Sequence, residues 1–196
     1  SDQRPSNASD HADPVAPRFD AELDAWLGPF FMAPVNTRVV RRSAALLGYG
    51  PDFHYQEYLR LGRGATRALA ATALSAGSVA SQWAMGITPV RRLAQRLAPP
   101  PGAGPSEASM DGGAFHSRIV GRAADGTLVR GHIADQGDPG NRATTKMLCE
   151  SALALALQTD ALPGGKAGGG VLTPASGLGD VLVQRLRTAG MALQMG

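Results

Sequence analysis

The chain has 196 residues, of which 43% are hydrophobic and 18% charged, with 25 glycines and 14 prolines. This composition excludes a purely helical bundle and collagen, and the length suits one medium domain with or without flexible ends. A net charge of +3 is too small for a nucleic-acid footprint, and the lone cysteine, Cys149, excludes a disulfide framework and favours a reducing, cytoplasmic compartment.

The N-terminal residues 1–17 are polar and interrupted by proline, which predicts a disordered leader without a secretory signal. The domain proper is expected over residues 18–196. Its first apolar residues recur at helical spacing and predict a short helix that ends at Gly28; they are Phe19, Leu23, Trp26 and Leu27.

Two further elements are predicted before residue 60. Asn36 is a good N-cap for a helix over residues 37–47, which Gly48 would end. The alternation of Phe53 and Tyr55 with polar residues favours a strand over residues 53–59.

An alanine-rich segment over residues 63–98 is predicted to be helical. Between Arg67 and Arg91 it has 23 residues without a charge, which is long enough to cross a bilayer, but serine, threonine and glycine interrupt it. A buried helix and a helix lying on a membrane surface are both open alternatives. The arginines at its two ends would suit an anionic membrane surface.

The clearest local signal in the sequence is a β-hairpin over residues 114–134, with its turn at Asp125-Gly126. A two-residue turn there would place His132 opposite Ile119, and the hairpin histidines, His116 and His132, are interpreted as surface residues of the sheet.

The rest of the C-terminal half contains a loop, helices and a short strand. The expected elements are a loop over 99–113, a helix over 142–158 with Met147, Leu148, Ala152, Leu155 and Ala156 on its apolar side, a strand at Val171-Leu172, and a closing helix over 174–189. The predicted fold class is α+β, a mixed or antiparallel sheet with packed helices.

Most motifs of catalytic chemistry are missing. Gly164-Gly165-Lys166 lacks the remainder of a P-loop, and Gly177-Leu178-Gly179 lacks the third glycine of a dinucleotide fingerprint. Ser176 is not in a nucleophile elbow, no histidine pair has metal-site spacing, and Cys149 is predicted to be a small buried thiol. The sequence therefore identifies no catalytic residue, no cofactor-binding residue and no metal ligand.

Two groups of residues are candidate substrate-binding sites. The first group is Asn36, Arg38 and Arg42 at the start of the helix over 37–47, where the two arginines stand at positions i and i+4 and could hold a carboxylate or phosphate. Asp138 and Gly140 precede the helix over 142–158, and backbone amides there could face a ligand. A solvated helix face and a tight turn at a helix start are the respective structural alternatives.

Five segments together resemble the saccharopine dehydrogenase-like oxidoreductases. They are residues 28–43 (PFxMAxxNTRVVRRS), 49–58 (YGxxFxYxE), 104–107 (GPSE), 137–153 (GDPG…TxKMLxESAL) and 170–179 (GGVLTPAxxLG). The resemblance covers residues 19–195 in the same order, and within the family it is strongest to the mycobacterial type of trans-acting enoyl reductase.

The resemblance implies an oxidoreductase that uses NADP or NAD to reduce acyl double bonds in polyketide and cell-wall lipid synthesis. It places this chain on the C-terminal side, as a substrate and dimerisation domain that lacks the Rossmann half and is inactive alone. A non-catalytic acyl- or partner-binding module is the alternative.

The partners implied by the resemblance are the Rossmann domain of the same enzyme or a second copy of the chain, and a polyketide synthase acyl carrier. Contact with a membrane surface is also open. The closing helix would pack on the missing Rossmann domain, so its apolar stripe of Leu178, Val181, Leu182 and Leu186 would be partly uncovered here.

Overall fold

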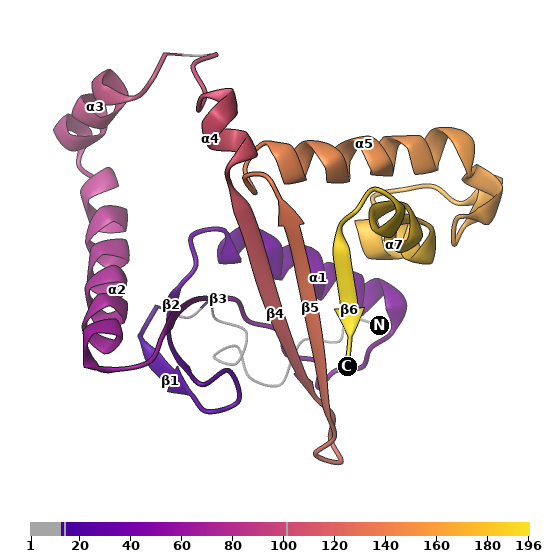
Figure 1. Ribbon diagram of the computed structural model, residues 1–196, viewed down its shortest axis with the longest axis horizontal. Coiled ribbons are helices and arrows are strands. Elements are labelled where there is room, and N and C mark those ends of the chain that lie inside the picture. Colours follow the sequence, from indigo (N-terminus) through magenta and orange to yellow (C-terminus); the bar gives the residue numbers. More distant parts are fainter. Residues whose placement is uncertain (1–12, 14, 101) are drawn as a thin grey trace. The chain divides into compact units, whose positions relative to one another are not determined.

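The structure is a computed structural model that describes residues 13, 15–100 and 102–196. It divides into two compact units, unit 1 (Ser1–Ala103) and unit 2 (Gly104–Gly196) (Figure 1). In the described residues each unit contains one three-stranded antiparallel sheet with helices, so the predicted α+β class is confirmed. The leader prediction falls mostly on residues outside the described part of the chain.

The sheet of unit 1 has the strand order β1-β2-β3, formed by Arg18–Asp20, Ala25–Pro29 and Tyr58–Gly62. The predicted helix over 19–27 is therefore wrong. Phe19 lies opposite Trp26 across the β1–β2 pair, with ring centroids 5.7 Å apart, and Ala25 and Leu27 are buried on β2. Spacing alone could not separate this cross-strand pairing from a helix face.

Helix α1 (Ala33–Leu47) begins one turn earlier than predicted. Its N-cap residue is Met32, and Pro34 stands in the first turn, where a missing N–H costs no hydrogen bond. Asn36 is therefore inside the helix and is not its N-cap. The helix ends as predicted at Gly48, whose φ is +69°. The strand predicted over 53–59 is wrong over 53–57, because β3 begins at Tyr58.

The alanine-rich segment is helical as predicted, but it forms two helices, α2 (Ala65–Met85) and α3 (Thr88–Leu97), separated by Gly86 and Ile87. α2 packs on the sheet through the buried residues Ala71 and Ser75. None of the described helices is long and apolar enough to cross a membrane.

A glycine in the middle of α2 provides a test of this packing. Gly77 is exposed, and a Cβ added there would meet nothing within 4 Å. Gly77→Ala is expected to raise the free energy of unfolding of unit 1 by about 0.5–1 kcal/mol, because alanine loses less conformational entropy in a helix. Urea unfolding followed by circular dichroism measures this change, and a destabilised variant would contradict an exposed position there.

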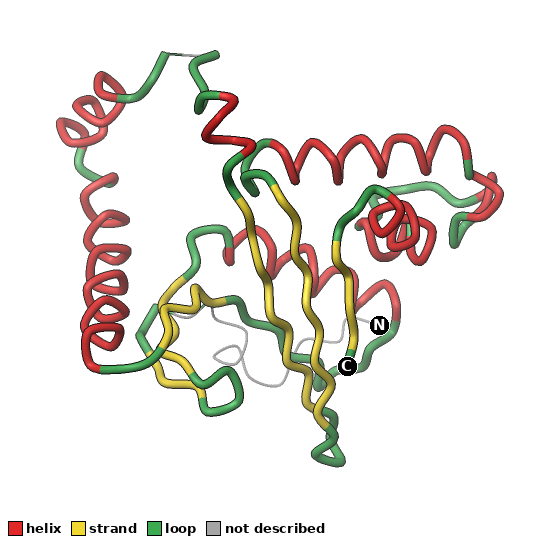
Figure 2. The backbone as a smooth tube through the Cα atoms, viewed as in Figure 1, coloured by secondary structure: helices red, strands yellow, loops and turns green. Residues whose placement is uncertain are grey.

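Unit 2 is built on the sheet order β4-β5-β6, shown as yellow strands in Figure 2. The predicted hairpin is confirmed as β4 (Ala114–Arg122) and β5 (Leu128–Gln136). β6 (Ala192–Met195) was not predicted, and Val171-Leu172 is not a strand. The helices are α4 (Glu107–Asp111), α5 (Arg142–Leu157), α6 (Pro174–Gly177) and α7 (Gly179–Thr188). The loop predicted over 99–113 is therefore wrong over 107–111, and the single closing helix predicted over 174–189 is wrong at Leu178, where α6 and α7 are separate.

The core of unit 2 lies between α5 and α7. Ala154, Leu162 and Leu178 are buried together there, with Val181 and Leu182 packed against them. α5 and the chain that follows it therefore cover much of the apolar stripe of the closing helix, and Leu186 is also buried. Val181 and Leu182 are only half-buried, so the stripe remains partly uncovered at these two positions.

α5 does not bury the side that its apolar residues predict. Its buried residues are Ala143 and Ala154, whereas Leu148 is 68% and Leu155 57% exposed. Cys149 is also exposed, so the predicted buried thiol is wrong. Two ion pairs account for this orientation, because Lys146 of α5 pairs with Asp135 and Glu150 of α5 pairs with Arg185.

Candidate functional site

In unit 1 the carboxylate of Glu57 accepts hydrogen bonds from side chains of two segments that are far apart in the sequence. The Asn36 amide of α1 donates a hydrogen bond to Glu57 Oε2 at 2.9 Å, and the Tyr55 hydroxyl donates to Glu57 Oε1 at 2.8 Å. Both carboxylate oxygens thus have a donor, and all three side chains are half-buried. We call these three residues, with Arg41, the Glu57 cluster.

Arg41 attaches the cluster to α1. Its Nη2 donates to the Tyr55 carbonyl oxygen at 3.2 Å and lies 3.8 Å from Asp13 Oδ1. Burial first, and then the hydrogen bond to Glu57, raise the pKa of the Tyr55 phenol well above its ordinary value. The phenol is therefore protonated at neutral pH, and the cluster holds a carboxylate beside a neutral hydroxyl.

The structure places the two arginines predicted as a pair outside this cluster. Arg38 is 71% exposed in its side chain; it donates to the Pro34 carbonyl oxygen and lies 3.8 Å from Asp13 Oδ2. Arg42 is exposed as well. Of the sequence-predicted residues in this region, Asn36 alone contacts Glu57 in the described structure, and it does so from within the helix.

The side chain of Asp138 accepts hydrogen bonds from residues at the start of α5. Its Oδ1 accepts from the backbone N–H of Arg142 at 2.9 Å, and its Oδ2 accepts from the backbone N–H of Asn141 at 3.0 Å and from the Asn141 amide at 2.8 Å. The backbone N–H of Arg142 is the main cause that lowers the pKa of Asp138. A Cβ added at Gly140 would lie 3.3 Å from Asp138 Oδ2, so this glycine leaves room for the turn. The geometry favours the structural alternative for both residues.

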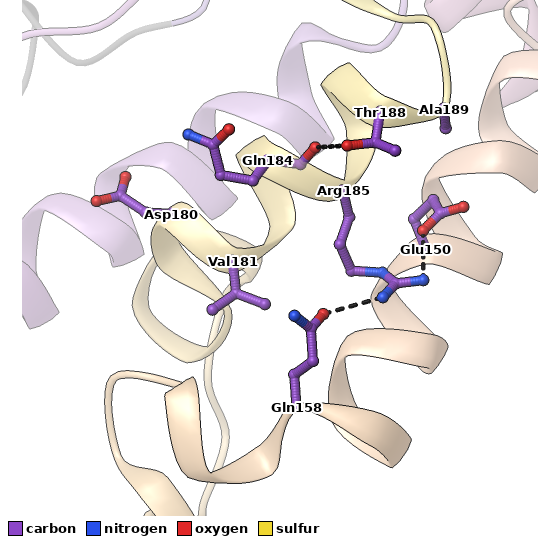
Figure 3. Close-up of a pocket in the computed structure, with 8 residues that line it drawn as sticks. All are labelled: Glu150, Gln158, Asp180, Val181, Gln184, Arg185, Thr188 and Ala189. Atoms are coloured by element: carbon purple, nitrogen blue, oxygen red, sulfur yellow. Dashed lines mark hydrogen bonds and ion pairs between the residues drawn. The ribbon is translucent and has the colours of Figure 1, made fainter.

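Unit 2 contains a pocket of about 620 Å³ beside the α5–α7 contact (Figure 3). Arg185 of α7 donates to Gln158 Oε1 at 2.9 Å and pairs with Glu150 Oε2 at 2.8 Å. The lining residues are Glu150, Gln158, Asp180, Val181, Gln184, Arg185, Thr188 and Ala189. Most of these residues are polar, but the surface that they present to the pocket is mostly apolar, so the pocket combines apolar walls with the paired charges of Glu150 and Arg185. No sequence motif predicted this pocket, because its paired charges, Glu150 and Arg185, are 35 residues apart in the sequence.

The hairpin histidines lie together on one face of the sheet. The Nδ1 of His116 is 3.4 Å from the Nε2 of His132, and the rings are stacked with centroids 5.5 Å apart. The predicted register is wrong by one residue, since His132 lies opposite Arg118. The turn has three residues instead of two, because the N–H of Ala123 bonds the carbonyl oxygen of Thr127, and the one-residue shift brings both histidines to the same face.

No metal centre is formed among these residues. Within residues 13, 15–100 and 102–196, no three His, Cys, Asp or Glu side chains are grouped closely enough to hold a metal ion.

A nicotinamide dinucleotide does not fit the turn between β3 and α2. Gly62-Arg63-Gly64 between β3 and α2 begins like a dinucleotide fingerprint, which the sequence analysis did not consider, and both glycines have positive φ. Arg67 stands where the third glycine belongs, and its Cγ lies 4.0 Å from the position of a Cβ at Gly62. β3 is antiparallel to its neighbour, and no acidic residue follows in the sequence until Glu107.

Comparison with known proteins gives a consistent set of relatives. A Mycobacterium tuberculosis protein, provisionally named a trans-acting enoyl reductase, is 38% identical over 177 residues, which is 86% of this chain and 41% of that protein. Trans-acting enoyl reductases of Mycobacterium bovis and Mycobacterium ulcerans are 37% identical over 174 residues, covering 86% of this chain and 40% of their own length.

No family model and no solved structure matches the chain. The chain spans about two fifths of the length of the curated relatives that it matches. It is similar over most of its own length to part of proteins named as trans-acting enoyl reductases.

Proposed function

We propose that this chain is the substrate-side part of a nicotinamide-dependent enoyl reductase of the saccharopine dehydrogenase-like type, which reduces acyl double bonds in polyketide or cell-wall lipid synthesis. The observation that carries the proposal is the identity of 37–38% to proteins named trans-acting enoyl reductases over 86% of the chain. The resemblance of the five sequence segments points the same way.

The cofactor, NADP or NAD, is assigned in this proposal to a nucleotide-binding part other than the residues described. The Gly62–Gly64 turn supports this assignment, because Arg67 replaces the third glycine. When bound, the nicotinamide would supply the hydride. This chain would contribute the groups that hold and orient the acyl substrate, and it would be inactive alone.

The Glu57 cluster is the proposed substrate-side site in unit 1. Its carboxylate is fixed by two hydrogen bonds, and its phenol stays protonated, so the cluster offers a fixed array of polar groups to a substrate. A 2-enoyl thioester, carried by an acyl carrier protein, is the proposed substrate class. The partner is either a nucleotide-binding domain or a second copy of this chain.

A hybrid enzyme tests the proposal. This chain would replace the matching residues of one of the mycobacterial relatives, and NADPH consumption would be followed with a 2-enoyl thioester. We expect the hybrid to reduce the thioester, and we expect Glu57→Gln to lower the rate at least about tenfold, because glutamine removes the negative charge and replaces one of the two acceptor oxygens, which receive hydrogen bonds from Asn36 and Tyr55, with an NH2 donor.

Asp52→Asn is the matched control, since it removes an exposed carboxylate five residues away. A folded hybrid that binds NADPH but reduces no enoyl thioester would contradict the reductase proposal and favour a non-catalytic binding module. Saturable NADPH binding by this chain alone would contradict the assignment of the cofactor to another part.

A further inference from the structure

The stretch from β3 to the start of α4 carries positive charge only. Residues 58–106 contain six arginines and no aspartate, glutamate or lysine, although the whole chain has a net charge of only +3. Three of these arginines, Arg91, Arg92 and Arg96, lie on the ten-residue helix α3. This local excess of positive charge is complementary to an anionic surface.

α3 is amphipathic and buries none of its residues. At about 100° per residue, Val90, Leu93 and Leu97 lie on one side of the helix, and Arg91, Arg92 and Arg96 lie on the other side. Leu93 is 57% and Leu97 76% exposed. An amphipathic helix normally buries its apolar side, yet no residue on the apolar side of α3 is buried in the described structure.

The end of α2 and the connection to α3 continue this apolar surface along the chain. Trp83 is 79%, Met85 47% and Ile87 53% exposed. Tryptophan is enriched in the headgroup region of bilayers, because its ring is apolar and its indole N–H needs a polar partner. We call Trp83, Met85, Ile87, Val90, Leu93, Leu97 and the three arginines of α3 the α3 surface.

We propose that the α3 surface docks on an anionic lipid bilayer, with α3 lying in the headgroup region. The leucines would enter the acyl boundary while the arginines bind lipid phosphates. A bilayer fits better than a protein groove, because apolar and cationic side chains are exposed together and no acidic residue accompanies them. α3 has ten residues and lies on the membrane without crossing it. The proposal does not depend on the reductase function.

Vesicle flotation with the whole chain tests the docking. The probe vesicles are phosphatidylcholine with about one-third phosphatidylglycerol, and pure phosphatidylcholine vesicles are the uncharged comparison. The chain should float with the anionic vesicles and far less with the uncharged ones. In a Trp26→Phe background, which keeps an aromatic ring beside Phe19, the emission of Trp83 should shift to shorter wavelength on binding.

Two sets of substitutions separate the apolar and electrostatic contributions. Leu93→Glu with Leu97→Glu should abolish flotation. The triple change Arg91→Gln, Arg92→Gln and Arg96→Gln should weaken binding about a hundredfold, at about fivefold for each arginine near an anionic surface.

The control removes the same charge elsewhere, by changing Arg118, Arg122 and Arg130 of the unit 2 hairpin to glutamine, and it should bind within about threefold of the unmodified chain. Circular dichroism would check that each variant is folded. Equal flotation with charged and uncharged vesicles would overturn the proposal, as would equal loss in the α3 and hairpin triples. No flotation of the unmodified chain would also overturn it, and would leave a protein partner as the occupant.

Discussion

Replacing Gly137 with alanine is expected to lower the free energy of unfolding of unit 2 by about 3 kcal/mol. Gly137 has a φ of +89°, and a Cβ there would lie only 2.6 Å from the Cβ of Arg142. The backbone has little freedom to move away, because the N–H of Gly137 donates to the carbonyl oxygen of Gly113 at 2.8 Å. The substitution therefore combines left-handed strain with a steric clash. Urea unfolding followed by circular dichroism would measure the loss.

Gly126→Ala is the matched control for this prediction. Gly126 has nearly the same φ, +87°, but a Cβ there would meet nothing within 4 Å. The free energy of unfolding of the Gly126→Ala variant should fall by only about 1 kcal/mol, the cost of holding an alanine at positive φ. If both variants lost the same stability, the close approach between Gly137 and Arg142 would be contradicted.

Replacing Lys146 with methionine should cost unit 2 about 2 kcal/mol, because it leaves the carboxylate of Asp135 buried without its cation. The side chain of Asp135 is 4% exposed, and Lys146 Nζ lies 2.8 Å from its Oδ1 and 2.7 Å from its Oδ2. The remaining hydrogen bond that the structure shows comes from the backbone N–H of Gln136 at 3.0 Å. Because Lys146 is itself 29% exposed, we expect less than the full effect of a wholly buried pair.

The double variant Asp135→Asn, Lys146→Met separates the buried charge from the lost packing. Asparagine keeps an acceptor for the Gln136 N–H and carries no charge, so most of the stability should return, to within about 1 kcal/mol of the original chain. Chemical denaturation of the single and double variants provides the comparison. Equal losses in the two variants would contradict the prediction, because they would show that the loss comes from the packing of Lys146 and not from the unpaired charge of Asp135.

Local signals predicted the hairpin and most helices, because turn residues and helix ends act over a few neighbours. Asp125-Gly126 marked the hairpin turn, and Gly48 marked the end of α1. The β1–β2 pair was missed because Phe19 and Trp26 satisfy both a helical and a cross-strand spacing. β6 was missed because four residues at the end of a chain carry little pattern of their own.

The candidate sites were less predictable, because they depend on pairings between distant residues. Asn36 was identified for its place near a helix start, yet it matters because Glu57 lies opposite it after the chain returns. The side of α5 that faces inward is set by Asp135 and Arg185, which hold Lys146 and Glu150. Sequence periodicity counts apolar residues, so it selected the opposite side and placed Cys149 in the interior.

The division into two units has an optical consequence. Both tryptophans, at positions 26 and 83, and all three tyrosines, at 49, 55 and 58, belong to unit 1. Absorbance and intrinsic emission above 280 nm therefore report on unit 1 and give no signal from unit 2. Cys149 is the chain's only cysteine and is exposed on α5. A single thiol-reactive dye at that position would make unit 2 visible without any substitution, and energy transfer from the tryptophans would then follow the separation of the two units in solution.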